Sequence, residues 1–291
     1  MNTQLGEQNT VQSNRTVNRN DRNMARRQLS NKNKEKYITI SVDDGHPTDL
    51  RTVDLLHKYG LTATFYVPGA NHERVVMTPS QVREIDRQFE VGSHTLSHIR
   101  LTWMSPERAR NEVIDGKKFS EDTLGHEVVA FCYPGGKFNR RIEKYVEEAG
   151  FLAGRTCRYF LNDYPKNPFS WDISTYANTY PAYVQVRHCF LEYNFAGAYR
   201  YLTTFKSRVP WVDQFVCALD DVNQNGGMAH LYYHSWEIEQ NGEWDKLEHL
   251  FQIIAQYKDL TPVTNGFLNR RWHERRASTA APKLASSQLQ A

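Results

Sequence analysis

Four side chains able to bind a metal ion or move protons occur in two short segments of the chain. Asp43 and Asp44 stand side by side in SVDDGHP, residues 41–47, and His94 and His98 stand four residues apart in GSHTLSH. Carboxylate and neutral imidazole are zinc ligands, and a catalytic zinc keeps three protein ligands and one open position. The pattern favours a metal site built from both histidines and one aspartate.

The adjacent aspartates need a reason to lie together. Asp43 and Asp44 end an apolar run, where two neighbouring carboxylates repel unless a cation or a proton-transfer role offsets the repulsion. A divided role meets this need: one carboxylate binds the metal while the other takes a proton from the attacking water as general base. Taken separately, Asp-Asp-Gly is also ordinary turn chemistry, and a His pair can be two unrelated polar residues.

The surrounding segments alternate between strand and helix patterns. We expect strands at 37–42, 63–67, 89–93, 128–132, 228–233 and 260–264, and helices at 50–59, from 79, from 105 to about 119, 140–149 and 244–257. Such βα units imply a parallel sheet, open or closed into a barrel. Residues 159–221 break the rhythm, and their many aromatic residues indicate an irregular insertion.

Functional groups of parallel βα proteins gather at the carboxyl ends of the strands. Asp43 and Asp44 follow the first strand, the two histidines follow FEVGS, Tyr133 to Gly136 follow VVAFC, and His234 follows MAHLYY. If the segment after FEVGS is helical, His94 and His98 share one face.

Composition narrows the function classes. The net charge of +3 hides two basic ends, 1–36 and 270–291, around a region 37–269 with 23 basic and 29 acidic residues. We therefore expect one catalytic domain at 37–269, with the aromatic-rich insertion at about 159–221, between polar basic tails of which the first is disordered. An acidic folded part argues against nucleic acid as a partner.

The chain shows no apolar leader, no bilayer-spanning run and no CxxC pair among its four cysteines. We expect free thiols, no membrane segment and a cytoplasmic location. The sequence does not indicate the oligomeric state.

The segments resemble the polysaccharide deacetylase family, also called carbohydrate esterase family 4 or the NodB-homology domain. SVDDG, SHTLSH, a Pro-Gly turn after a strand and a strand-end His are similar to its first, second, third and fifth motifs, over about residues 37–267. The resemblance implies an α/β fold, a distorted (β/α) barrel of about seven parallel strands. It also implies metal-dependent removal of acetyl from an N-acetylated saccharide.

Roles follow by the same resemblance. Asp43 is the general base, Asp44, His94 and His98 bind one divalent metal, and His234 is the general acid. Zn²⁺ is the leading expectation, with Co²⁺ and Mn²⁺ as alternatives.

The later motifs depart from the family pattern. The third motif usually reads Arg-x-Pro-Tyr-Gly, whereas this chain has Cys132-Tyr133-Pro134-Gly135-Gly136, so the arginine beside the base is missing. Arg155 is a candidate substitute, with an ordinary surface arginine as the alternative. Gly135 keeps the backbone N–H that would serve the oxyanion, a donor worth roughly 3 kcal/mol of barrier.

The fourth motif has no clean match; Asp172, Asp220 and Asp221 are candidates for it. In the fifth, LYYHSWE, Glu237 could orient His234, although a solvated loop glutamate is the favoured interpretation. Aromatic rings suit sugar faces, and the candidate substrate contacts, each with core or rim packing as its alternative, are Trp103, Tyr133, Trp171 and Trp236.

Three other functions stay open. An amidohydrolase acting on a cyclic imide or another small amide could use the same Asp-His-His site. A glycan-binding module without catalysis would follow if the missing arginine disabled the base. A nucleic-acid protein acting through its basic ends would bind with steep salt dependence, lost on deletion of those ends.

Overall fold

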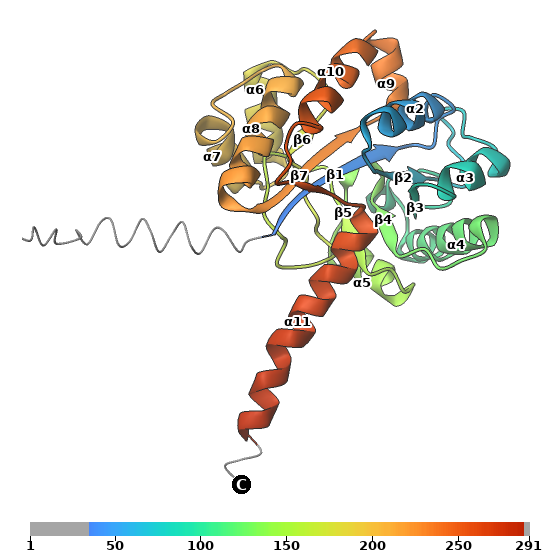
Figure 1. The fold of residues 1–291 in the computed structure, drawn as a ribbon. Helices are drawn as coiled ribbons and strands as arrows, with labels where there is room; N and C mark the ends of the chain where they lie inside the picture. Colours follow the sequence, from blue (N-terminus) through green and yellow to red (C-terminus); the bar gives the residue numbers. More distant parts are fainter. Residues whose placement is uncertain (1–34, 288–291) are drawn as a thin grey trace, which may run out of the picture. The chain divides into compact units, whose positions relative to one another are not determined.

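The computed structural model describes residues 35–287, with side chains described to residue 278 (Figure 1). The strands are all parallel and follow the order β5-β4-β3-β2-β1-β7-β6. They are β1 (Lys36–Asp43), β2 (Thr64–Val67), β3 (Glu90–Ser93), β4 (Ala130–Cys132), β5 (Ala153–Arg155), β6 (Thr175–Tyr176) and β7 (Gly227–Tyr233), with β8 (Thr261–Pro262) paired to the start of β1. Among the described residues no ladder joins β5 to β6, so the barrel is incomplete. The predicted distorted barrel is confirmed.

The central strand β1 is buried on both faces. Ile38, Ile40 and Val42 alternate with Thr39 and Ser41, and none of the five is more than 1% exposed. The apolar set belongs to the main hydrophobic core. Thr39 and Ser41 instead hydrogen bond to buried polar side chains from α11 (Asn265–Ser287) and β7. The barrel interior is therefore polar, which lets charged groups lie at its upper end.

The five predicted helices begin within one residue of the expected positions. They are α2 (Asp49–Tyr59), α3 (Pro79–Asp86), α4 (Pro106–Leu124), α5 (Arg140–Glu148) and α10 (Trp244–Ile254). The sequence patterns did not predict α8 (Trp211–Asn225) or α9 (Ser235–Gln240), or the single 3₁₀ turns at Leu101–Trp103 and Pro134–Gly136. Thr78 forms a capping box with Gln81, and Asn139 accepts two backbone N–H groups at the start of α5. In the part of the chain described, no helix has the length and apolarity that a membrane crossing requires.

The aromatic-rich region is more regular than expected. Beyond residue 174 it contains β6, α6 (Ala182–Leu191), α7 (Phe195–Thr203) and the first part of α8. The expectation of an irregular insertion is wrong there, because α6 and α7 carry apolar residues on their outer as well as inner faces and so hide the helical period.

The predicted domain limits remain predictions. The helix α11 runs across the limit at residues 269 and 270 into the predicted basic tail. Its first turns pack on the barrel through Leu268 and Asn269. Residues 1–34 of the predicted first tail lie outside the described part.

Candidate active site and metal centre

The candidate side chains meet at the carboxyl ends of four strands of the sheet. Asp43 ends β1, while His94 follows β3, Gly135 follows β4 and His234 follows β7. They surround one cavity of about 370 Å³. Eight of the ten predicted site residues line it: Asp43, Asp44, His94, His98, Pro134, Gly135, His234 and Trp236. The other two, Arg155 and Tyr133, lie behind its wall.

Arg155 pairs with Asp43. The guanidinium Nη2 donates to both carboxylate oxygens of Asp43, and each residue is 1% exposed. The surface-arginine alternative is therefore wrong. Arg155 comes from β5, and the curl of the sheet carries its side chain across the barrel interior to β1. The base candidate thus has a buried cationic partner, although the third motif lacks arginine.

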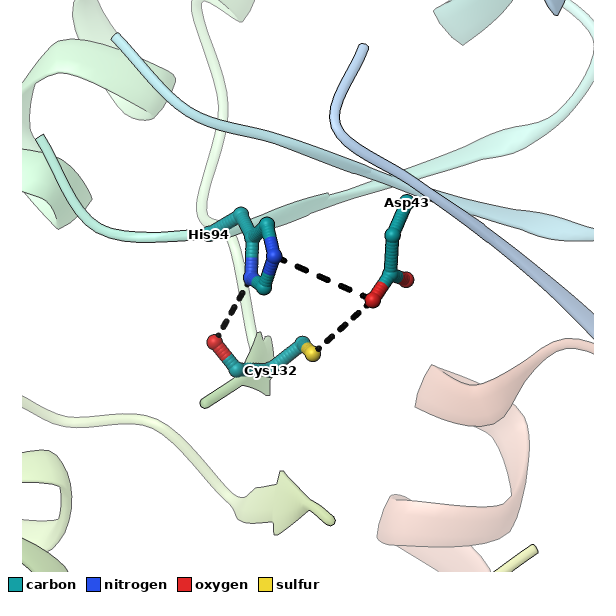
Figure 2. A group of neighbouring side chains, drawn as sticks. All are labelled: Asp43, His94 and Cys132. Carbon is teal, nitrogen blue, oxygen red and sulfur yellow. Dashed lines mark hydrogen bonds and ion pairs between the residues drawn. The ribbon is translucent and has the colours of Figure 1, made fainter. Parts of the chain in front are cut away.

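Cys132 stands where the third motif usually has its arginine. Figure 2 shows His94, Asp43 and Cys132 grouped together, with each residue joined to the other two by a dashed line. The Cys132 thiol donates to Asp43 Oδ2 at 3.4 Å, and His94 Nδ1 lies 2.9 Å from the Cys132 carbonyl oxygen. Because that carbonyl only accepts, Nδ1 carries the hydrogen, and His94 Nε2 is left with its lone pair towards the carboxylates.

Asp44 faces both imidazoles. Its Oδ1 lies 2.9 Å from His98 Nε2 and 3.7 Å from His94 Nε2, and it accepts no well-directed hydrogen bond within the described part although it is buried. The segment after β3 is not helical; instead Thr95 and His98 adopt left-handed backbone, with φ of 68° and 56°. Asp44 does the same, with φ of 78°, which aspartate tolerates better than most residues. Turns of this kind, and not a helix face, bring the three side chains together.

These three residues fit a divalent cation. One ligand atom from each of Asp44, His94 and His98 lies within 4.8 Å of the others. A tetrahedral ion at about 2.1 Å from each atom would hold them roughly 3.4 Å apart, a value between the 2.9 Å and 3.7 Å that separate Asp44 Oδ1 from the two imidazole nitrogens. The unbonded Asp44 Oδ1 and the free His94 Nε2 point to the same space.

A second group, Asp43, His94 and Cys132, also has metal-ligand spacing. Two features argue against a cation there. The Arg155 guanidinium already occupies both oxygens of Asp43 and would repel a cation. Burial also raises the pKa of the Cys132 thiol well above its ordinary value, so it stays protonated, whereas a metal ligand must be a thiolate.

The protonation states suit the first group. Burial lowers the pKa of His94 to about 4, even though Asp43 acts in the opposite sense. His94 is therefore neutral at pH 7, as a ligand must be. Burial acts to raise the pKa of Asp44, but attraction to His234 and the contact with His98 outweigh it and hold that pKa well below its usual range.

His234 lies on the other side of Asp44. Its Nδ1 is 2.7 Å from Glu237 Oε2 and its Nε2 is 2.9 Å from the Tyr232 hydroxyl. Burial acts to lower the pKa of His234, but Asp44 and the bonded Glu237 raise it to about 9. The imidazole is therefore protonated at neutral pH, which is the state that a general acid needs.

Glu237 and Tyr232 are residues that sequence reasoning missed or misjudged. Glu237 lies in the first turn of α9 with its side chain 17% exposed, so the solvated-loop interpretation is wrong. Tyr232 stands two residues before His234 along β7, and this spacing places both on one side of a strand. This two-residue spacing could have identified Tyr232 as a neighbour of His234 from the sequence.

The candidates for the fourth motif bond elsewhere. Asp172 pairs with Arg158 at 2.7 Å, Asp220 accepts from the Tyr257 hydroxyl, and Asp221 accepts from Asn162. In this structure Glu237 holds the place beside His234 that a fourth-motif aspartate was expected to fill.

The aromatic residues that were predicted to contact substrate differ in whether they are buried or line the cavity. Tyr133 is 0% exposed, stacks on Phe138 and donates to the Phe169 carbonyl, so the prediction that its ring contacts substrate is wrong. Trp171 is likewise buried. Trp103 lines the cavity and is 72% exposed. An exposed flat ring at the mouth keeps the sugar-contact hypothesis for Trp103.

Trp236 contacts the candidate metal ligand directly. Its indole N–H donates to Asp44 Oδ2 at 2.9 Å, and its ring lies against His234 with 5.3 Å between ring centres. This bond fixes the carboxylate so that Oδ1 faces the two histidines. Partners of this kind orient metal ligands and affect affinity.

We expect Trp236→Phe to weaken Zn²⁺ binding roughly 10- to 100-fold, because the ring is kept while the bond to Asp44 is lost. Competition with a chromophoric chelator measures the Kd without reference to activity. Trp103→Phe, in the same cavity but without a bond to a candidate ligand, is the matched control. Equal affinities for both variants would contradict the positioning role.

Fold and site together define a class: an incomplete parallel (β/α) barrel with a candidate carboxylate-imidazole metal site at the carboxyl ends of its strands. The family model described as polysaccharide deacetylase matches residues 30–154. The matched residues are similar to that family; they include β1 to β4 and the first two residues of β5, and therefore Asp43, Asp44, His94 and His98, but not Arg155.

Relatives align with about two fifths of the chain. A peptidoglycan-N-acetylglucosamine deacetylase of Bacillus cereus is 38% identical over 122 residues, which are 41% of this chain and 55% of that protein. The peptidoglycan-N-acetylmuramic acid deacetylase PdaC of Bacillus subtilis is 31% identical over 116 residues, 39% of this chain and 24% of that protein. The chain thus spans about half of the first relative and a quarter of the second.

Solved structures match over more of the chain and show the fold. Peptidoglycan deacetylase PdaC from Bacillus subtilis aligns with a TM-score of 0.50 and 20% identity, covering 86% of this chain and 98% of that one. The Xyl-CE4 domain of a multidomain xylanase from the hindgut metagenome of Trinervitermes trinervoides aligns with a TM-score of 0.51 and 20% identity, covering 82% and 92%.

Proposed function

We propose that this protein is a metal-dependent hydrolase that removes the acetyl group from an N-acetylated sugar of a saccharide or glycosyl precursor. One observation carries the proposal: Asp43, the Asp44-His94-His98 group and the His234-Glu237 pair line one cavity. The family match over residues 30–154 and the names of the relatives support the reaction class.

Asp44, His94 and His98 would hold the divalent ion, with Zn²⁺ favoured by the imidazole ligands and Co²⁺ and Mn²⁺ as alternatives. Such an ion would polarise the acetyl carbonyl and acidify the attacking water. Asp43, held by Arg155, takes the proton from that water. The protein thus supplies both the ligands that would position the ion and the carboxylate that accepts the proton.

Other residues of the cavity would stabilise the oxyanion and protonate the leaving amine. Gly135 would offer its backbone N–H to the oxyanion that forms at the carbonyl. His234, protonated and held by Glu237, gives its proton to the leaving amine. Trp103 would lie against a sugar ring at the mouth.

The direct test is acetate release from N-acetylglucosamine oligomers, peptidoglycan fragments and nucleotide-linked N-acetylhexosamines, with and without chelator. We expect release that the chelator abolishes and that Zn²⁺, Co²⁺ or Mn²⁺ restores. No acetate from any of these substrates, with about one equivalent of metal bound, would overturn the proposal in favour of an imide hydrolase or a binding module.

Glu237→Gln should move the alkaline limb of the pH profile of kcat/KM to lower pH. Glu237 is one of the groups that raise the pKa of His234, so its neutral replacement lowers that pKa. A general acid works only while protonated, and activity is lost as pH rises through its pKa; a lower pKa therefore brings the loss at lower pH. Asp220→Asn, which removes a carboxylate that accepts a hydrogen bond from Tyr257, should leave the limb in place. A limb that stays fixed in Glu237→Gln would exclude the role.

A further inference from the structure

The outer surface of α6 and α7 is apolar. Among residues 35–278, seven of the eleven exposed large hydrophobic side chains lie between residues 183 and 202. They are Tyr183, Phe190, Leu191, Tyr193, Phe195, Tyr199 and Leu202, between 54% and 82% exposed. We call residues 182–203 the α6–α7 hairpin. Exposed apolar clusters of this kind mark interaction surfaces.

The helical spacing shows that the exposure is regular. In α7, Phe195, Tyr199 and Leu202 follow the spacing i, i+4, i+7 and form one outward stripe, while Gly197 and Tyr201 face inward and are buried. An ordinary surface helix carries charged residues on its outward stripe. The rings of Phe190 and Phe195 meet at 5.7 Å between centres and join the stripes of the two helices.

The charged residues near the α6–α7 hairpin indicate what kind of partner it would contact. Residues 177–212 contain four cationic residues, Arg187, Arg200, Lys206 and Arg208, and one acid, Glu192. Glu192 is paired with Lys137, and Arg200 is paired with Asp163 and Asp221, so Arg187, Lys206 and Arg208 carry the local positive charge. Arg187, Lys206 and Arg208 are exposed beside the apolar stripes. A second copy would set the same cations against each other, whereas anionic lipid headgroups complement them.

The composition also suits a bilayer surface. Phenylalanine and leucine fit the acyl boundary, and tyrosine is enriched at the headgroup level. Aliphatic Leu191 and Leu202 on convex helices offer no flat platform for a sugar ring. We propose that the α6–α7 hairpin docks this protein on the surface of anionic lipid bilayers.

The hairpin is tied to the same end of the barrel as the cavity. β6 leads into α6 from its carboxyl end, and Glu192 pairs with Lys137, which follows the cavity-lining Gly135. Figure 1 shows α6 and α7 on the outer side of α8. Docking would therefore keep the cavity near the lipid surface, whichever substrate it takes.

Flotation of the full chain with phosphatidylglycerol/phosphatidylcholine vesicles tests the proposal. We expect binding that pure phosphatidylcholine does not support, that falls at least about tenfold in Phe195→Ser/Leu202→Ser, and that falls in Lys206→Glu/Arg208→Glu. Val75→Ser, at a position 67% exposed outside the hairpin, should bind like the unaltered protein. The substituted side chains are exposed, so unchanged circular dichroism and Tm are expected for each variant.

Three results would overturn the proposal. If Phe195→Ser/Leu202→Ser and Lys206→Glu/Arg208→Glu both bound vesicles as well as the unaltered protein does, the affinity would be assigned to the basic ends, which all variants retain. A dimer in sedimentation that Phe195→Ser/Leu202→Ser dissociates would show that a second copy covers the patch. Absent lipid binding, with retention on insoluble peptidoglycan that the same variant loses, would assign the patch to a glycan.

Discussion

Asp43→Asn is expected to lower kcat by about 10²- to 10⁴-fold while one metal ion still binds. Asparagine keeps the shape of the side chain but cannot take a proton from water. The group Asp44, His94 and His98 is untouched by the change. Acetate release under saturating substrate measures kcat, and metal content after dialysis measures binding.

The adjacent residue supplies the matched control. Asp44→Asn removes a candidate ligand, so we expect metal affinity to fall and activity to return, in part, at high metal concentration. Asp43→Asn should show no such recovery. If both variants lost metal equally, the assignment of separate roles to the two carboxylates would be wrong.

Arg155→Met is expected to lower the free energy of unfolding by about 3–5 kcal/mol, because it leaves the Asp43 charge buried without its partner. Urea unfolding at pH 7, followed by circular dichroism, measures the loss.

The double variant Arg155→Met/Asp43→Asn separates charge from packing. If the cost comes from an unpaired buried charge, the second substitution should recover much of the stability lost in the first, while activity stays absent. Equal stability of the single and double variants would show instead that Arg155 matters through its packing.

Much of the barrel and part of the site could be predicted. Strands such as 37–42 and 228–233 read as short apolar runs between turn signals, so the strand-end placement of Asp43, His94 and His234 followed from the βα rhythm. A site that lies at adjacent strand ends needs only the order of the strands.

The rest depends on curvature and on side-chain direction. Arg155 lies on β5, with β4, β3 and β2 between it and β1 in the sheet, and only the curl brings it to Asp43. Local patterns do not encode that curl. The burial of Tyr133 could not be predicted for a similar reason, since a turn sequence does not specify which way its first ring points.

The helical hairpin was hidden for a different reason. Its outward residues are apolar, so the contrast between faces that reveals a surface helix is missing from the sequence. The apolar outward residues, which concealed the two helices in the sequence, are the same residues that we propose as the docking surface.

The source of Arg155 has a consequence for finding related enzymes. A linear pattern that demands arginine two residues before the proline of the third motif rejects this chain, which has Cys132 there. A spatial rule, asking for any guanidinium bonded to the carboxylate that ends β1, accepts it. Chains set aside as inactive for lack of that arginine should be searched again with the spatial rule, beginning with the strand that follows the motif.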